Sequence, residues 1–314
     1  MKSFTPLTST VAALALFSGA PAFADAHADA HNDAQADATH ETTTLPVGPE
    51  GPALWKVADE DTTIYLFGTI HLLAPGTKWY DAEIAGALNS ADTVVTEVKM
   101  DPQSELAMQQ IAMQRGMFTD GTTLRSLLTP EQTTAYEGAL SGLGVPAAAF
   151  DAFEPWIAGL TLTMLPLMQQ GYDSNAGVDR IILAKAGSKP AEALETAEFQ
   201  LGLFDGLPQE KQVAFLMEAI ESMPDAAGTL DAVVGEWVEG DADGLAVLMN
   251  EGLNDPELAE ALLYTRNANW ADWIDARLDT PGTVFIAVGA GHLAGERSVQ
   301  DYLSQRDIET MRVQ

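Results

Sequence analysis

The chain has 314 residues, and 46% of them are hydrophobic, which predicts a folded protein with a sizeable core rather than a disordered chain. It contains no cysteine, so cysteine nucleophiles and thiolate metal ligands are excluded. Asp and Glu number 46 against 15 Lys and Arg, a formal charge of −31, so nucleic acid and anionic membrane surfaces are poor partners. We interpret this charge as a solubility adaptation rather than as a site for a cationic ligand.

Residues 1–24 have the pattern of a secretory signal peptide. Lys2 supplies a positive end, residues 11–17 supply a short apolar run, and Ala22 and Ala24 supply small residues for cleavage before Asp25. The apolar run is shorter than the roughly 20 residues that span a bilayer, so an uncleaved anchor is the disfavoured alternative. We therefore expect a periplasmic or secreted protein without a stable membrane anchor.

Residues 25–51 form a segment rich in Ala, Asp, His and Thr, with no hydrophobic period. This composition predicts a disordered linker. His27, His31 and His40 lie here among acidic residues and could bind metal ions loosely. A solvated tether is the favoured interpretation, because nothing in the segment fixes a ligand geometry.

The remaining residues, 52–314, are predicted to form one domain that opens with a hairpin. Runs rich in β-forming residues at 53–57 and 62–67 flank an acidic turn. An amphipathic helix at 81–89 and a short apolar strand at 93–98 follow. Strand, helix and strand in this order indicate a parallel crossover unit.

Helices dominate the rest of the domain. Between residues 101 and 179 the helical pattern is broken by Gly and Pro, and its apolar stripes, around Met108 and around Trp156, are interpreted as core packing. Further predicted elements are helices at 180–186, 209–223, 230–250, 256–278 and 298–304, and strands at 190–195, 283–288 and 308–313. The alternation predicts an α/β fold, with a mixed, largely parallel sheet flanked by helices and a helical insertion.

Two similar motifs follow two of the predicted strands. Gly68 stands three residues before His71, and Gly289 stands three residues before His292. One such pair would mean little by chance, but both lie at the carboxyl end of a strand, where α/β sheets bind ligands. A lone histidine would be read as a core residue, whereas two at matching strand ends predict a shared site.

Histidines at strand ends suit a metal site. Two imidazoles and one carboxylate form a recurrent hydrolytic set, with water in an open coordination position. Glu97, at the end of the neighbouring strand, is the candidate third ligand or general base, and Glu195 is a second candidate. The alternative for each glutamate is a solvated strand end.

Arg266 and Asn267 interrupt the apolar stripe of the long predicted helix. A guanidinium there could bind a substrate carboxylate or stabilise an oxyanion, and the alternative is a pair with a structural acid. The acidic segment at 239–244 has weak similarity to a calcium loop, but it lacks the closing acid and is set aside. Serine hydrolase, nucleotide-binding and zincin motifs are absent from the sequence.

These motifs, in this order from about Pro52 to the C-terminus, resemble the TraB/GumN family. The resemblance implies the fold of the Tiki proteins and the erythromycin esterase-like group. Tiki proteins are membrane-tethered metalloproteases that prefer manganese or cobalt. By this likeness His71, Glu97 and His292 match the essential positions, and the further site candidates are Glu195, Arg266, Asn267 and Asp179. The chain departs from the pattern at Lys99, where many relatives have an acid.

The sequence therefore predicts an exported hydrolase that depends on a divalent metal, with Mn, Co or Zn as the candidate ions. A peptide or small molecule is the expected substrate. His71 and His292 would ligate the metal, with Glu97 as ligand or base. Two alternatives stay open: a protein that binds a peptide or small ligand at this site without turnover, and a structural protein whose polar residues serve packing.

Overall fold

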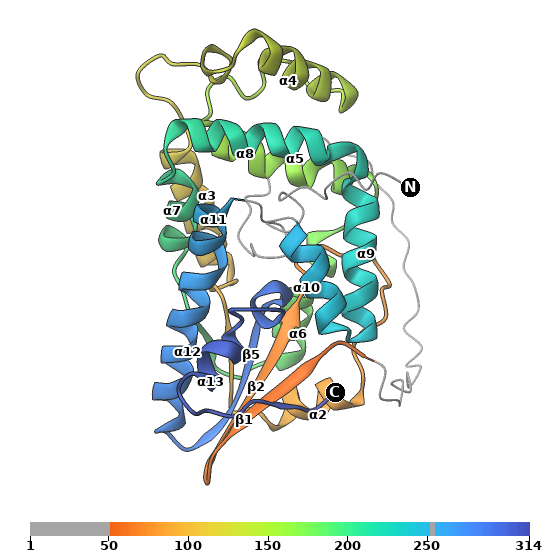
Figure 1. Cartoon of the computed structure of the whole chain (residues 1–314), viewed down its shortest axis with the longest axis vertical. Helices are drawn as coiled ribbons and strands as arrows, with labels where there is room; N and C mark the ends of the chain where they lie inside the picture. Colours follow the sequence, from red (N-terminus) through yellow and green to blue (C-terminus); the bar gives the residue numbers. More distant parts are fainter. Residues whose placement is uncertain (1–50, 252–254) are drawn as a thin grey trace.

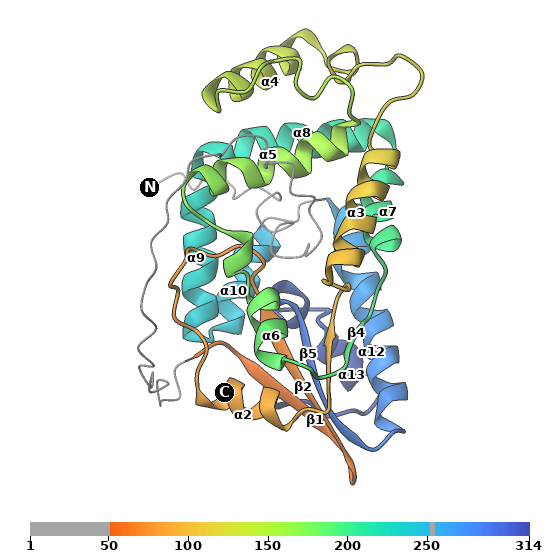
Figure 2. The same cartoon turned by 180° about the vertical axis from the view of Figure 1, so that it is seen from behind.

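The computed structural model describes residues 51–251 and 255–314. The predicted signal peptide, 1–24, and nearly all of the predicted linker, 25–51, lie outside the described residues. A six-stranded sheet occupies one end of the molecule, and a helical region occupies the other (Figures 1 and 2). The strands are β1 (Leu54–Ala58), β2 (Thr62–Thr69), β3 (Thr93–Thr96), β4 (Ala191–Ala193), β5 (Gly282–Gly289) and β6 (Met311–Arg312).

The sheet is mixed and largely parallel, as the sequence predicted. Its strand order is β4-β3-β5-β2-β1-β6. The four strands from β4 to β2 pair in parallel, whereas β1 pairs antiparallel with both β2 and β6. The predicted opening hairpin is thus confirmed, and β5 lies between β3 and β2, the strands that the first crossover connects.

Strand β5 is buried on both sides, which explains its uninterrupted apolar sequence. Val284 and Ile286 face one cluster, which includes Trp270 and Ile274. The alternating residue Phe285 faces the other cluster, where helices cover the opposite side of the sheet. Helices α12 (Thr265–Leu278) and α13 (Val299–Ser304) therefore cover one face, and α2 (Ala82–Ser90) and α6 (Val178–Ala186) cover the other.

The helical insertion comes in two parts, one between β3 and β4 and one between β4 and β5. Helices α5 and α8 lie side by side across the molecule, and α4 lies beyond them at the end farthest from the sheet (Figures 1 and 2). The α-helices are α2 (Ala82–Ser90), α3 (Pro102–Arg115), α4 (Pro130–Gly142), α5 (Pro155–Gln169), α6 (Val178–Ala186), α7 (Ala197–Asp205), α8 (Gln209–Ser222), α9 (Ala226–Glu239), α10 (Ala242–Glu251), α11 (Pro256–Ala259), α12 (Thr265–Leu278) and α13 (Val299–Ser304).

Two of the long predicted helices are interrupted. The helix predicted at 230–250 is two helices, because Gly240 adopts a left-handed conformation (φ 71°) and ends α9. The helix predicted at 256–278 contains one π-helical turn, η4 (Glu260–Tyr264), between α11 and α12. The apolar stripes around Met108 and Trp156 are core, as predicted, although Met113 at the edge of the first is 38% exposed.

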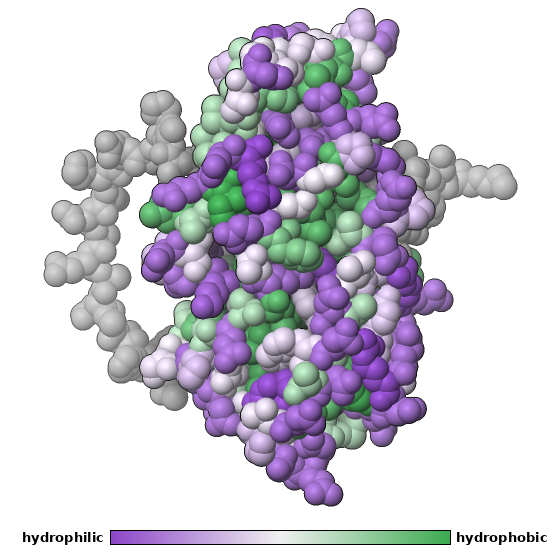
Figure 3. Space-filling model, turned by 90° about the vertical axis from the view of Figure 1, so that its left-hand side faces the viewer, coloured by the Kyte–Doolittle hydropathy of each residue, from purple (hydrophilic) through white to green (hydrophobic). Residues whose placement is uncertain are grey.

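Polar residues cover most of the visible surface, with smaller apolar patches between them (Figure 3). Such a surface suits the formal charge of −31, since like charges keep chains apart in solution. Within residues 51–251 and 255–314, no helix is long and apolar enough to cross a membrane.

Candidate active site

The carboxyl ends of the four parallel strands meet at one edge of the sheet, which faces the helical region (Figure 1). Strand β2 ends two residues before His71, and β3 ends immediately before Glu97. Strand β4 ends two residues before Glu195, and η5 (Ala290–Leu293), which carries His292, follows β5 directly. Parallel pairing therefore brings together four side chains that are far apart in the sequence.

Arg266 lies at the centre of this group and is fully buried. Its Nη2 donates to Glu97 Oε2 (2.5 Å) and to Glu195 Oε2 (2.8 Å), and its Nε donates to Glu195 Oε1 (2.8 Å). Its Nη1 donates to the Leu262 carbonyl (2.9 Å) and to His292 Nε2 (3.0 Å). All five N–H donors of the guanidinium are thus used within the protein. In this arrangement Arg266 has no donor left for the predicted contact with a substrate oxyanion.

Two adjacent residues of the site come from one helix, immediately after its π-helical turn. Arg266 and Asn267 directly follow η4, at the start of α12, and both side chains are buried. The Arg266 side chain donates to the Leu262 carbonyl, which lies inside the π turn. Single π turns within helices are frequent at functional sites, since they turn side chains away from the regular α-helical positions.

His292 is held as a neutral ring. Its Nε2 accepts from Arg266, so the ring proton sits on Nδ1, which donates to Asn267 Oδ1 (2.5 Å). The Asn267 amide is itself oriented, because its Nδ2 donates to the Arg297 carbonyl (2.8 Å). Burial lowers the pKa of His292 well below its ordinary value, and the nearby charges of Arg266 and His71 lower it further.

His71 is set up differently. Its Nδ1 lies 2.5 Å from Asp179 Oδ2, and Thr69 donates to the other oxygen of this carboxylate (2.8 Å). Asp179 is buried in the first turn of α6, where a helix favours negative charge. Burial lowers the pKa of His71, but the attraction of Asp179, helped by Glu97, outweighs burial and raises it overall.

The second ring nitrogen of His71, Nε2, differs from Nδ1 in its surroundings. Nε2 is buried, and no hydrogen-bond partner lies within reach among the described residues. Because the Asp179 carboxylate can only accept, Nδ1 carries the proton and Nε2 of the neutral ring carries a lone pair. The His71 side chain is 9% exposed, whereas Glu97, Arg266 and His292 are 0% exposed.

Glu97 is held from several directions. Its Oε1 accepts from the Gly289 backbone N–H (2.7 Å), and its Oε2 accepts from Arg266 and from Gln200 Nε2 (3.0 Å). Burial raises the pKa of Glu97, whereas Arg266 and His71 act in the opposite direction. The Oε1 atom lies 3.9 Å from His292 Nε2, so this carboxylate also lies beside the neutral imidazole.

Three residues of the site were missed by the sequence interpretation. Gln200 Nε2 donates to both Glu97 and Glu195. Trp270 donates to Glu195 Oε1 (2.9 Å), and the centre of its ring lies 4.3 Å from the centre of the His292 ring. Thr69 fixes Asp179. The available signal for Gln200 was a polar residue on the apolar face of α7, next to the buried Leu201. Trp270 gave no signal, because its position in α12 fits the core stripe.

The predicted metal ligands fit a divalent ion only in part. His71 fits, since a ligating imidazole usually donates its other N–H to a carboxylate, as His71 does to Asp179. Glu97 and His292 do not fit as they stand, because the Arg266 guanidinium occupies Glu97 Oε2 and His292 Nε2. Within residues 51–251 and 255–314, no three ligand side chains are arranged to hold an ion.

Comparisons with known proteins match most of the length of this chain. A family model described as TraB/PrgY/gumN family matches residues 53–312. An uncharacterized protein of Treponema pallidum is 24% identical over 270 residues, which cover 80% of each chain. The uncharacterized protein YbaP of Escherichia coli is 23% identical over 254 residues, which cover 80% of this chain and 92% of YbaP. No solved structure matches this chain.

Proposed function

This chain belongs to the TraB/PrgY/gumN family, and from that premise and the site geometry we propose that it is a hydrolase in which His71 is the general base. The proposed substrate has a peptide or ester-like bond. His71 Nε2 would take a proton from the attacking water, and Asp179 would hold the ring and stabilise the imidazolium that forms.

The unpartnered Nε2 of His71 is the observation that carries this proposal. A buried polar atom without a partner is costly, on the order of 1–3 kcal/mol, so such atoms in native sites point to a missing ligand or water. The rest of the ring is fixed by Asp179, as a base that must face one reacting proton requires. His292 has no comparable free nitrogen, since both of its ring nitrogens are engaged.

In this proposal the Arg266 cluster is a rigid support and not a substrate clamp. Arg266 neutralises part of the charge of Glu97 and Glu195, and it holds these carboxylates at the strand ends beside the base. Glu97 contributes to the electrostatic attraction that raises the pKa of His71. In this proposal the cluster acts on the base only through its charges, since Glu97 raises and Arg266 lowers the pKa of His71, and it makes no hydrogen bond to the substrate.

A divalent metal at His71, Glu97 and His292 stays a prediction from the family resemblance. If bound, the ion would supply an activated water at His71. Such a site requires Arg266 to release Glu97 Oε2 and His292 Nε2.

A binding protein without turnover is the second candidate. One observation favours it. The Arg266 guanidinium, which could stabilise an oxyanion, donates its hydrogen bonds to groups within the protein. Both candidates place the ligand at His71 Nε2. They differ in whether product accumulates.

The test is a hydrolysis screen of the full chain with fluorogenic peptide libraries and nitrophenyl esters. We expect activity that falls at least about 100-fold in His71→Gln, since a positioned base contributes about 10²–10⁴-fold. Asp179→Asn should also lower the activity, because it removes the carboxylate that holds the ring of His71. Asp151→Asn is the matched control for it, because Asp151 pairs with Arg125, which is not a residue of the site. Full activity in His71→Gln would overturn the proposal.

Two further arms separate the candidates. Ligand binding that depends on His71 without any turnover would support the binding protein. Activity that needs added Mn, Co or Zn, and is lost in both His71→Gln and His292→Gln, would support the metal hypothesis and contradict a metal-independent base.

We also propose that the chain is exported, on the basis of residues 1–24. N-terminal sequencing of the protein from its native source tests this point. A mature chain that begins at Asp25 would support export, and a retained Met1 would contradict cleavage.

A further inference from the structure

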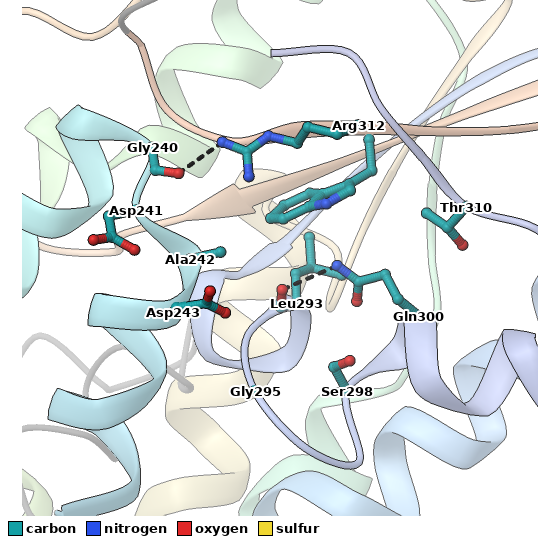
Figure 4. Close-up of a pocket in the computed structure, with 11 residues that line it drawn as sticks. Gly240, Asp241, Ala242, Asp243, Leu293, Gly295, Ser298, Gln300, Thr310 and Arg312 are labelled. Carbon is teal, nitrogen blue, oxygen red and sulfur yellow. Dashed lines mark hydrogen bonds between the residues drawn. The ribbon is translucent and has the colours of Figure 1, made fainter.

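A polar pocket lies next to the turn that carries His292 (Figure 4). It has a volume of about 390 Å³, within the range of small-molecule sites. Leu293, the residue after His292, is part of its wall, although none of the site residues above lines it. Its lining includes the polar, charged and aromatic side chains of Trp55, Asp241, Asp243, Gln300, Thr310 and Arg312.

The pocket is lined by side chains of opposite charge that form no ion pair with each other. Asp241 and Asp243, at the start of α10, lie on one wall, and Arg312 of β6 lies above them (Figure 4). Among the described residues, Arg312 makes no ion pair within 4.0 Å, and its Nη2 donates to the Gly240 carbonyl (2.7 Å). Burial lowers the pKa of Arg312, and both carboxylates act in the opposite direction, so their charges reach it across the gap.

Packing fixes the positive side of the pocket. The Arg312 guanidinium lies over the Trp55 ring, 5.0 Å from its centre, and is anchored at one end by Gly240. Cation–π contact and a carbonyl bond restrict the guanidinium without neutralising it. Its Nε and Nη1 can therefore donate to an anionic group, which a planar guanidinium recognises well.

Two hydrogen-bonding atoms on the wall opposite to Asp243 are unsatisfied. Gln300 Nε2 donates to the Leu293 carbonyl (2.9 Å), which fixes the amide and leaves Oε1 buried without a partner. Thr310 Oγ1 is also buried and has no hydrogen-bond partner among the described residues. Figure 4 shows Gln300 and Thr310 on the side of the pocket opposite to Asp241 and Asp243, with the Gln300 side chain extending toward Leu293. Buried atoms of this kind indicate a missing ligand or water.

We propose that this pocket binds a small zwitterion of the α-amino acid class. The carboxylate of the ligand lies at Arg312, and its ammonium group lies at Asp243 and Asp241, with Gln300 Oε1 as an additional acceptor. Opposite charges that do not pair with each other match a ligand that carries both. The calcium alternative for residues 239–244 fits less well, because Asp241 Oδ1 already accepts from the Gly244 N–H (2.8 Å) and a guanidinium shares the pocket.

The experiment is calorimetric titration of the full chain with the twenty common L-amino acids, and with acetate and methylammonium as probes that carry one charge each. We expect at least one amino acid to bind at least about tenfold more tightly than either probe, since each charged end adds a charge-assisted hydrogen bond. Arg312→Gln and Asp243→Asn should each weaken that binding at least about tenfold. Glu309→Gln, an exposed neighbour outside the pocket, should leave it unchanged.

Several results would overturn the assignment. No measurable binding by any amino acid in a chain with native circular dichroism is one. Equal binding of acetate or methylammonium is another. Binding that is lost in His71→Gln but kept in Arg312→Gln would place the ligand at the His71 site instead. Because the titration measures no turnover, it can succeed or fail independently of the proposed hydrolase activity.

Discussion

The two histidines of the GxxH motifs differ in what their second nitrogen does. Asp179 binds His71 on one side only, whereas His292 lies between Asn267 and Arg266. Their pKa values therefore shift in opposite directions, upward for His71 and well downward for His292. The two motifs are thus similar in sequence but differ in their surroundings. In the proposed function His71 is the reacting residue and His292 a supporting one.

Asp179→Asn tests how His71 is poised. Burial, the largest influence, lowers the pKa of His71, and Asp179 is the main group that opposes it. We expect the substitution to lower the pKa of His71. Since a general base works when deprotonated, the kcat/KM profile of the wild type should rise with pH through a value above 6.5, and that of the variant should rise at lower pH with a smaller maximum. An unchanged pH profile would contradict the role of Asp179.

Arg266→Met tests the buried cluster. The substitution leaves Glu97 and Glu195 buried without their cation, and breaking a buried pair in this way costs about 3–5 kcal/mol. We expect a loss of that size in urea unfolding. Arg115→Met is the matched control, because its pair with Asp205 is partly exposed and should matter little. Equal losses in the two variants would contradict a special role for Arg266.

At the scale of elements, short interruptions decide where the site residues lie. The π turn before α12 places Arg266 and Asn267 side by side in the site, and the left-handed Gly240 separates α9 from α10. The π turn could not be predicted from hydrophobic periodicity, because the apolar pattern continues through it. The break at Gly240 lies in the acidic segment 239–244, where the apolar pattern stops and a glycine is a usual helix end, and the predicted helix at 230–250 ran through this signal. The strand ends, by contrast, follow from the alternation of strands and helices, which explains why His71, Glu97, Glu195 and His292 were selected from the sequence.

Gly240→Ala tests the first of these interruptions. An added Cβ would meet the Gly51 carbonyl oxygen at 2.5 Å, and the left-handed conformation disfavours a side chain. We expect a loss of at least about 1 kcal/mol in the free energy of unfolding. Gly235→Ala is the control within α9, where a Cβ meets nothing within 4 Å and should stabilise by about 0.5–1 kcal/mol. A neutral Gly240→Ala would show that the break between the helices lies elsewhere.

At the scale of the whole molecule, the sequence predicted the class of fold and the edge of the sheet where the site lies. Parallel strands buried on both faces leave a clear apolar signal, as β5 does. The sequence could not show that Arg266 would meet both Glu97 and Glu195, since that contact depends on how α12 packs on the sheet. Gln200 was hidden for the same reason, because its partner Glu97 lies 103 residues away in the chain, although its other partner, Glu195, is only five residues away.

The central claim is that the two site imidazoles differ, with His71 poised as a base and His292 locked in the neutral form. The direct measurement is an NMR titration of the imidazole nitrogens in the full chain, with signals assigned through His71→Gln and His292→Gln. We predict that His71 titrates above 6.5, with its proton on Nδ1 in the neutral form, and that His292 stays neutral through the range in which ordinary histidines titrate. Two histidines that titrate together near 6.5 would contradict the account.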